Sequence, residues 1–136
     1  MREAIRELAA IGVLEFAPRR GAWVREVSLE EVIESLEVRA ELDRLAASRA
    51  AAKLRGRCGK LRATVRRIVA AAKKRDFVAF QEHNQVFHRS IVEAADNRAL
   101  LRVWGSLALD VRTRVIMDFL ASVDPIKLAT EHDAIT

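Results

Sequence analysis

Residues 76–97 read DFVAFQEHNQVFHRSIVEAADN, and this stretch decides how the fold is interpreted. Its apolar residues recur at the spacing of one face of an α-helix. The same face carries Asn84 and His88, where an ordinary amphipathic helix has only apolar side chains. An unsatisfied buried polar group costs about 1–3 kcal/mol, so neighbouring helices or a ligand must supply partners for both. The predicted inward face consists of Phe80, Asn84, Phe87, His88, Ile91 and Ala95.

The segments on either side of this stretch show the same helical periodicity. Ser28 and Glu31 form a capping-box pattern at the start of one helix, and Asp124 with Pro125 forms a start signal for another. We therefore predict an all-α fold, an antiparallel helical bundle formed by residues 27–136. The further helices of this bundle are predicted over about residues 28–53, 60–74 and 98–120, and from residue 126.

The helix predicted over residues 28–53 is apolar on two faces. Its second face carries Val38, Leu42 and Leu45. A helix that is apolar on two faces is expected to be covered on both, by bundle neighbours and by a second subunit. The face predicted to point inward carries Leu29, Val32, Ile33, Leu36, Ala40 and Ala47, with Arg39 and Asp43 on or beside it.

Residues 1–26 predict a different unit. MREAIRELAAI (1–11) has the pattern of a short amphipathic helix, and VLEFAPRRGAWV (13–24) has two apolar runs around a turn rich in Pro and Gly, which is typical of a β-hairpin. A helix followed by such a hairpin is half of a winged helix-turn-helix. In that arrangement the helix enters the major groove of DNA and the hairpin tip reaches the backbone or minor groove.

Composition limits the classes of partner. The net charge of +5 and the pI near 10.1 permit an anionic partner, including nucleic acid, without establishing one. Ten Lys or Arg and no acid lie between residues 51 and 75, a run that we interpret as a solvated helix face, partly paired with the acidic preceding helix, rather than a second nucleic-acid surface. No apolar run approaches the roughly 18 residues that span a bilayer. We therefore expect no association with a membrane. Cys58 is the single cysteine, which favours a reducing, cytoplasmic setting.

Two stretches carry a family resemblance: REAIRELAAIGVLEFAPRRGAWV (2–24) and SLEEVIESLEVRAELDRLAA (28–47). They closely resemble the end of the DNA-binding domain and the start of the sensor domain in GntR-type transcription regulators with a FadR-like (FCD) sensor domain. The resemblance implies a homodimeric, ligand-responsive repressor of operator DNA. Such regulators have further helices before the point that matches Met1, so the first part of the DNA-binding fold is expected to be missing here. By resemblance, the DNA-facing residues are Arg2 on the recognition helix and Arg19, Arg20 and Gly21 at the wing tip.

His88, Asn84 and His132 could ligate a metal. A histidine nitrogen and an amide oxygen one helical turn apart can bind one divalent cation, and an inward histidine on another helix can add a third ligand. The alternative is a set of core polar residues that hydrogen bond to one another. Many sensor domains of the resembled family hold zinc, nickel or manganese with an Asp-x-x-Phe-His pattern and two later histidines. Asn84-Gln-Val-Phe87-His88 matches with Asn for Asp, which is expected to weaken the site, and a third histidine would lie beyond Thr136.

Arg39 is the predicted effector-binding residue. A guanidinium that faces a polar pocket is suited to bidentate capture of a carboxylate. In similar regulators an arginine in this part of the first sensor helix helps to bind small organic acids. The alternative is a structural pair with Asp43, and the two interpretations do not exclude each other, because a ligand could displace the internal pair. His83 lies at the margin of the inward face and is predicted to be a surface or boundary residue.

Two other functional classes remain open on the sequence. One is a truncated module that dimerises or binds a ligand without binding DNA. The other is a small helical metalloenzyme in which a bound metal activates water. The sequence has no Gly-rich phosphate loop, no HExxH and no Ser–His–Asp pattern in a recognisable context. We therefore predict that the protein is not an enzyme, and we predict no catalytic residue.

Overall fold

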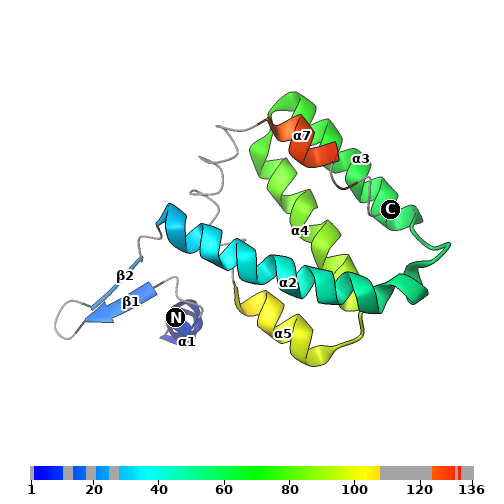
Figure 1. Cartoon of the computed structure of the whole chain (residues 1–136). Coiled ribbons are helices and arrows are strands. Elements are labelled where there is room, and N and C mark those ends of the chain that lie inside the picture. Colours follow the sequence, from blue (N-terminus) through cyan, green and yellow to red (C-terminus); the bar gives the residue numbers. More distant parts are fainter. Residues whose placement is uncertain are drawn as a thin grey trace.

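The chain folds into helices and one short hairpin, as the sequence predicts. The computed structural model describes residues 2–10, 14–17, 21–24, 28–107, 124–130 and 132, without the side chains of Arg2 and Leu8. Within these residues the hairpin is the only sheet, so the all-α prediction is confirmed (Figure 1). The elements are α1 (Arg2–Ala10), β1 (Leu14–Ala17), β2 (Gly21–Val24), α2 (Leu29–Leu54), α3 (Gly59–Lys74), α4 (Phe77–Ala94), α5 (Arg98–Ser106) and α7 (Pro125–Thr130).

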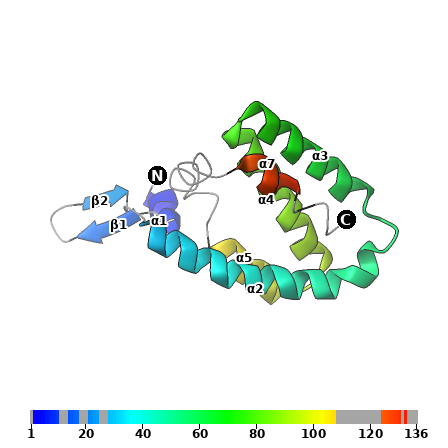
Figure 2. The ribbon, with the colours of Figure 1, turned by 45° about the horizontal axis from the view of Figure 1, so that its top comes forward.

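The core of the bundle lies around α4. This helix packs along α3 on one side and against α2 on the other, while α5 packs on α2 and α7 packs on α3 (Figures 1 and 2). The inward face predicted for α4 is confirmed, since its apolar members are buried and Asn84 and His88 are half-buried. The apolar face of α3 is also buried or half-buried: Leu61, Val65, Ile68, Val69 and Ala72.

Side chains cap the first turns of α2 and α4 by accepting hydrogen bonds from free backbone amides. The Ser28 hydroxyl accepts a hydrogen bond from the Glu31 amide at 3.1 Å, and the Glu31 carboxylate accepts one from the Ser28 amide at 3.3 Å. At the other side of the bundle, Asp76 Oδ1 accepts from the amide of Ala79 at 3.0 Å and so caps α4. Arg75 ends α3 with a left-handed backbone (φ 53°), which turns the chain directly into α4.

The inward face predicted for α2 is confirmed only in part. Val32 and Arg39 are buried as expected, but Leu29, Ile33 and Leu36 were also expected inside, and their exposed fractions are 48%, 47% and 41%. The buried line of the helix continues through Ala46 and Ala50. Small Ala46 and Ala50 let α2 approach its neighbours closely, and the larger apolar residues stay at the surface. On the second predicted face Val38 and Leu45 are exposed as well.

The N-terminal helix and hairpin form as predicted. Helix α1 packs on β1, and β1 pairs with β2 in an antiparallel register that sets Leu14 opposite Val24 and Ala17 opposite Gly21. Gly21 has φ +78°, a left-handed conformation that strains other residues, although an added Cβ would meet nothing within 4 Å. Glycine is therefore favoured at this position by the backbone conformation of the turn and not by close packing of neighbouring atoms.

The C-terminal helices are described in part. The helix predicted over residues 98–120 is confirmed over residues 98–106 as α5, which ends at Ser106 with Leu107 as its C-cap, earlier than predicted; residues 108–123 lie outside the described part of the chain. Helix α7 begins at Pro125, where Asp124 Oδ1 accepts from the amide of Ile126 at 2.9 Å, as its start signal predicts. None of the described helices is long and apolar enough to cross a membrane.

Candidate functional site

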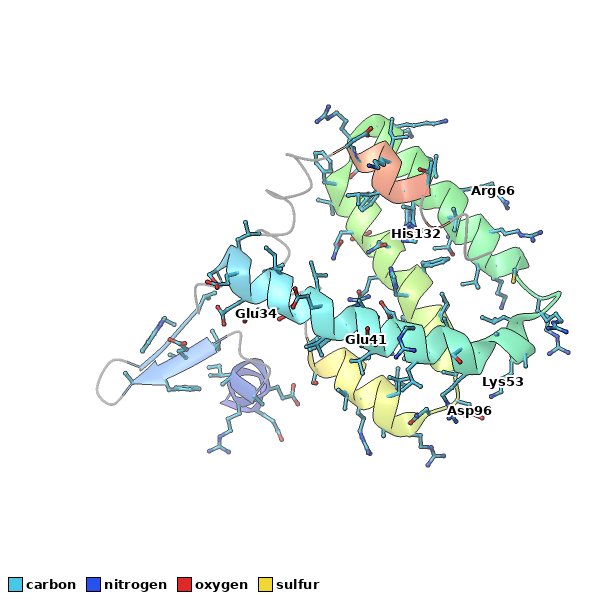
Figure 3. The ribbon with its side chains drawn as sticks, viewed as in Figure 1. Glu34, Glu41, Lys53, Arg66, Asp96 and His132 are labelled. Atoms are coloured by element: carbon cyan, nitrogen blue, oxygen red, sulfur yellow. The ribbon has the colours of Figure 1, made fainter. Side chains whose placement is uncertain are left out.

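Polar side chains from four parts of the chain meet inside the bundle. Helix α2 contributes Arg39 and Asp43, α4 contributes Asn84 and His88, α5 contributes Trp104, and His132 follows α7. Figure 3 shows His132 on the inner side of its segment, turned toward α4, where it contacts Asn84. We call this set the polar cluster: Arg39, Asp43, Asn84, His88, Trp104 and His132.

Asp43 lies at the centre of the polar cluster. Its Oδ2 is 2.9 Å from His88 Nδ1 and 3.5 Å from Arg39 Nε. Its Oδ1 accepts a hydrogen bond from Trp104 Nε1 at 2.7 Å. One carboxylate therefore joins α2, α4 and α5.

Arg39 is almost fully buried, with 7% of its surface exposed. Its Nη1 donates to Gln85 Oε1 at 3.1 Å, and the guanidinium carbon lies 4.2 Å from the centre of the Trp104 ring. A carboxylate, an amide oxygen and an aromatic face thus stabilise the buried cation together. The internal pair with Asp43, one of the two interpretations drawn from the sequence, is present.

His132 and Asn84 contact each other directly. His132 Nε2 is 2.8 Å from Asn84 Oδ1, and His132 Nδ1 is 3.1 Å from the carbonyl of Leu128 and 3.3 Å from that of Ala129. A carbonyl only accepts, so Nδ1 carries a proton. The contact between His132 Nε2 and the Asn84 side chain is a hydrogen bond in either of two arrangements. Either Nε2 is also protonated and donates to Oδ1, or the Asn84 amide is rotated and its NH₂ donates to a neutral Nε2.

The rings of the two histidines lie around Phe87. The Phe87 ring meets His88 edge-on at 5.5 Å and His132 edge-on at 4.9 Å between ring centres, and the two imidazoles are 5.6 Å apart. Phe87 itself has no exposed surface. A rigid core residue thus fixes both rings, and the structure brings together Asn84, His88 and His132.

The two histidines have the hydrogen bonding that metal-ligating histidines usually have. Such residues donate one ring N–H to a carboxylate or a backbone carbonyl and bind the metal through the other nitrogen. His88 Nδ1 faces Asp43, and His132 Nδ1 faces backbone carbonyls. The donor chemistry fits a divalent cation held by Nε2 of each ring and the Asn84 oxygen, but such a cation would have to replace the direct hydrogen bond between His132 and Asn84. However, within the described residues no three His, Cys, Asp or Glu side chains are grouped closely enough to hold a metal ion by themselves.

The environment of Asp43 predicts a pH dependence of stability. Burial raises the pKa of Asp43, but the hydrogen bond and charge of His88, the charge of Arg39 and the hydrogen bond from Trp104 outweigh burial and leave the pKa below its ordinary value of 3.8. A carboxyl group whose pKa is lower in the folded than in the unfolded chain stabilises the fold above its unfolded pKa. That contribution is lost as the pH falls through the folded pKa.

We therefore expect the free energy of unfolding to fall as the pH drops below about 4, and to fall less in the Asp43→Asn variant. Urea unfolding followed by circular dichroism at about pH 6 and about pH 3 measures both changes. Ser48→Ala, an exposed position on the same helix, should retain the full wild-type decline. Parallel declines in wild type and Asp43→Asn would contradict the assignment.

Sequence reasoning missed three features of the site. It considered Asp43 only as a partner of Arg39, whereas Asp43 also contacts His88. It did not ask where the indole N–H of Trp104 finds an acceptor, and in the structure that acceptor is Asp43. The contact of Gln85 with Arg39 could not be predicted, because a polar residue beside the apolar face of a helix is usually at the surface.

The predicted DNA-facing residues are described only in part. Arg2 begins α1, but its side chain lies outside the described part of the structure, and so do Arg19 and Arg20. Gly21 opens β2 at the hairpin turn. His83, predicted as a boundary residue, is half-exposed between α3 and α4 and is not in the polar cluster.

Comparison with known proteins places this geometry in a family. Residues 34–136 match the FCD domain. A curated relative, described as a probable D-xylose utilization operon transcriptional repressor of Paenarthrobacter nicotinovorans, is 34% identical over 117 residues, which are 86% of this chain and 52% of that protein. The chain thus spans about half the length of the curated relative that it matches.

Two solved structures share the fold. E. coli McbR/YncC superposes with a TM-score of 0.75 and 23% identity over 97% of this chain and 62% of that chain. Lar, described as controlling expression of the Listeria monocytogenes agr system, gives a TM-score of 0.51 and 18% identity over 98% of this chain and 74% of that chain. At these identities the likeness concerns the fold alone. The FCD match and the homologous repressor together show that the chain belongs to the GntR-type transcription regulators with an FCD domain.

Proposed function

We propose that the complete protein is a transcription repressor that binds operator DNA as a homodimer and senses a small organic acid at the polar cluster. The observation that carries this proposal is the buried Arg39, which is held by a carboxylate that a ligand carboxylate could replace. The curated relative, itself described as a probable transcriptional repressor, supports the regulatory part.

The polar cluster offers a route from ligand to DNA. Asp43 joins α2 to α4 and α5, so a ligand that takes its place beside Arg39 changes the contacts between these helices. Helix α2 leads back to the hairpin, and its exposed Leu29, Ile33 and Leu36 are suited to contact a second subunit. A shift of α2 would then alter the spacing of the two DNA-reading units of a dimer, and with it the affinity for a palindromic operator.

The role of Arg39 can be tested by ligand binding. A panel of small mono- and dicarboxylic acids is screened by thermal shift, and the acid that raises the melting temperature is titrated by calorimetry. Arg39→Gln is expected to weaken binding about 10- to 100-fold, because hydrogen bonds to a charged group contribute about 1.5–3 kcal/mol. Arg44→Gln, an exposed arginine of the same helix, should bind as wild type does. Equal affinities in wild type and Arg39→Gln would refute Arg39 as the effector-binding residue.

A second proposal concerns a divalent metal such as zinc, nickel or manganese. We propose that Asn84, His88 and His132 hold it in the complete protein. The support is the orientation of the two histidines, whose Nδ1 atoms are engaged by Asp43 and by backbone carbonyls in the manner of metal ligands. A bound cation there would supply a Lewis-acidic contact for the carboxylate of the effector.

Metal analysis of protein prepared without chelators tests this second proposal. We expect near-stoichiometric divalent metal in wild type and its loss in His88→Ala, because the site then has too few ligands. Added zinc or nickel should raise the melting temperature of wild type but not of His88→Ala. His83→Ala serves as the matched control and should keep the metal. Metal-free wild type with unchanged melting in both ions would exclude the site.

A further inference from the structure

The outer surface of α3 carries two rows of positive charge. A spacing of seven residues is close to two helical turns, so Lys60, Arg67 and Lys74 lie in one row. Arg62, Arg66 and Lys73 are spaced four and seven residues apart, about one and two helical turns, so they lie in a second row. All six side chains are exposed. Figure 3 shows Arg66 projecting outward from α3. We call this surface the α3 basic face: Lys60, Arg62, Arg66, Arg67, Lys73 and Lys74.

Small residues separate the two rows. Gly59 and Ala70 are exposed and Ala63 is half-exposed, so no large side chain rises between the rows. Beside the row formed by Lys60, Arg67 and Lys74, a hollow of about 170 Å³ separates α3 from His83 of α4. The α3 basic face therefore resembles a shallow track with cations along both edges.

Four cations of the α3 basic face have no acidic partner among the described residues. The run from residue 51 to residue 75 contains ten cations and no acid, and Asp76, which follows it, lines the hollow together with Arg67 and Lys74. In the part of the chain that the structure describes, Arg66, Arg67, Lys73 and Lys74 make no ion pair with an acid. Lys53, another cation of this run, pairs with Asp96 at 3.1 Å. Lys53 belongs to α2, and Asp96 lies between α4 and α5, so this ion pair does not involve α3. The pairing with α2 that we expected from the sequence does not involve these four residues.

The sequence alone favoured a solvated helix face here, but the arrangement of the cations in two rows leads us to a different interpretation. We propose that the α3 basic face binds the phosphate backbone of duplex DNA without reading its sequence, at a place separate from the helix-and-hairpin unit. The 16-residue helix is about 24 Å long, which corresponds to about seven base pairs. A phosphate strand that follows the small residues meets cations on both sides. In both views α3 lies on the side of the bundle away from β1 and β2, so the two units would contact different stretches of DNA (Figures 1 and 2).

The structure favours DNA over two other anionic partners. A helix that lies on a membrane needs an exposed apolar face, whereas the apolar face of α3 is buried against α4 and α7. The exposed acids of α2 (Glu30, Glu34, Glu37 and Glu41) could attract the α3 basic face of another copy. Unless that contact were reciprocal between two copies, it would give rings or open-ended chains rather than a two-fold dimer. The regularly spaced phosphates of DNA match the two parallel rows of cations better than a membrane surface or another copy of the chain does.

Binding to a random-sequence duplex, measured by fluorescence anisotropy over a range of salt concentrations, tests the proposal. The test variant combines Arg66→Gln, Arg67→Gln, Lys73→Gln and Lys74→Gln. Each lost phosphate contact is expected to reduce the slope of log K against log salt by about 0.9, so the slope should fall by about 3 to 4. The control variant combines Arg44→Gln, Arg49→Gln, Arg98→Gln and Arg102→Gln on α2 and α5, with the same change in net charge, and should keep the wild-type slope.

Several results would overturn the proposal. Equal loss of binding in the test and control variants would mean that net charge alone is responsible. Loss of binding in Arg19→Gln/Arg20→Gln would assign it to the hairpin. Tighter binding to vesicles containing phosphatidylglycerol than to DNA would indicate a membrane surface, and salt-sensitive self-association lost in the test variant would indicate contact with α2. The test does not involve operator sequence or effector, so it can fail while the proposed regulatory function stands. Circular dichroism of each variant verifies folding.

Discussion

Replacing Phe87 by alanine is expected to lower the free energy of unfolding by about 4 kcal/mol, the largest effect of any single change considered for this chain. The Phe87 ring has no exposed surface and lies between α4 and the segments packed against it. Truncation removes the ring and leaves a cavity that the surrounding helices cannot fill completely. Urea unfolding followed by circular dichroism gives the difference directly, provided that the slope of the transition is unchanged.

The Phe87→Ala variant should also loosen both histidines. The ring supports His88 at 5.5 Å and His132 at 4.9 Å between centres, so its loss removes the contact that fixes both imidazoles. Val86→Ala, the neighbouring position with 52% exposure, is the control and should change stability by less than about 0.5 kcal/mol. If the two variants lost the same stability, Phe87 would not be the core of this site.

Replacing Asp43 by alanine is expected to cost about 3 kcal/mol, because removing one partner of a buried ion pair leaves the other charge without compensation. Three donors lose their acceptor at once: Arg39, His88 and the indole N–H of Trp104. Asp43→Asn should cost less, since the amide oxygen can still accept from one donor. Urea unfolding measures the loss, and the NMR resonance of the Trp104 indole N–H reports the hydrogen bond itself.

An exposed acid on the same helix provides the control for Asp43. Glu41 pairs with Arg44 at 2.9 Å, and both side chains are more than two-thirds exposed. Surface pairs of this kind contribute about 0–1 kcal/mol, so Glu41→Ala should be nearly neutral. A neutral Asp43→Ala would show that the polar cluster does not hold the three helices together.

The periodicity of the sequence predicted the helices and most of their buried faces. In α4 one stripe was apolar enough to determine which side faces the core, and Phe80, Phe87 and Ile91 are buried as expected. In α2 the same reasoning succeeded only for Val32 and Arg39. That helix is apolar on two sides, and its buried side continues with small alanines rather than with Leu29, Ile33 and Leu36. Periodicity identifies an apolar face, but it cannot decide between two when the choice depends on how closely a neighbour packs.

The candidate site was predictable where its residues share a helix. Asn84 and His88 stand one turn apart, and Arg39 and Asp43 do too, so local spacing revealed both pairs. The contact between Asp43 and His88 joins residues 45 positions apart in sequence (88 minus 43) and depends on the packing of α2 against α4. No pattern within one helix contains that information.

The 3.5 Å contact between Arg39 and Asp43 has a consequence for the proposed binding of an effector acid. Asp43 is anchored one turn from Arg39 on the same helix, so it acts as a tethered competitor whose effective concentration is of the millimolar order typical of short links, or higher. A free carboxylate that offered only this one interaction would have to reach a similar concentration to displace it. If Arg39 binds an effector as proposed, Asp43 would set a concentration threshold: trace amounts of common acids would leave the site unchanged, and only a ligand with further contacts, to Gln85 or Trp104 for example, would bind at lower concentrations.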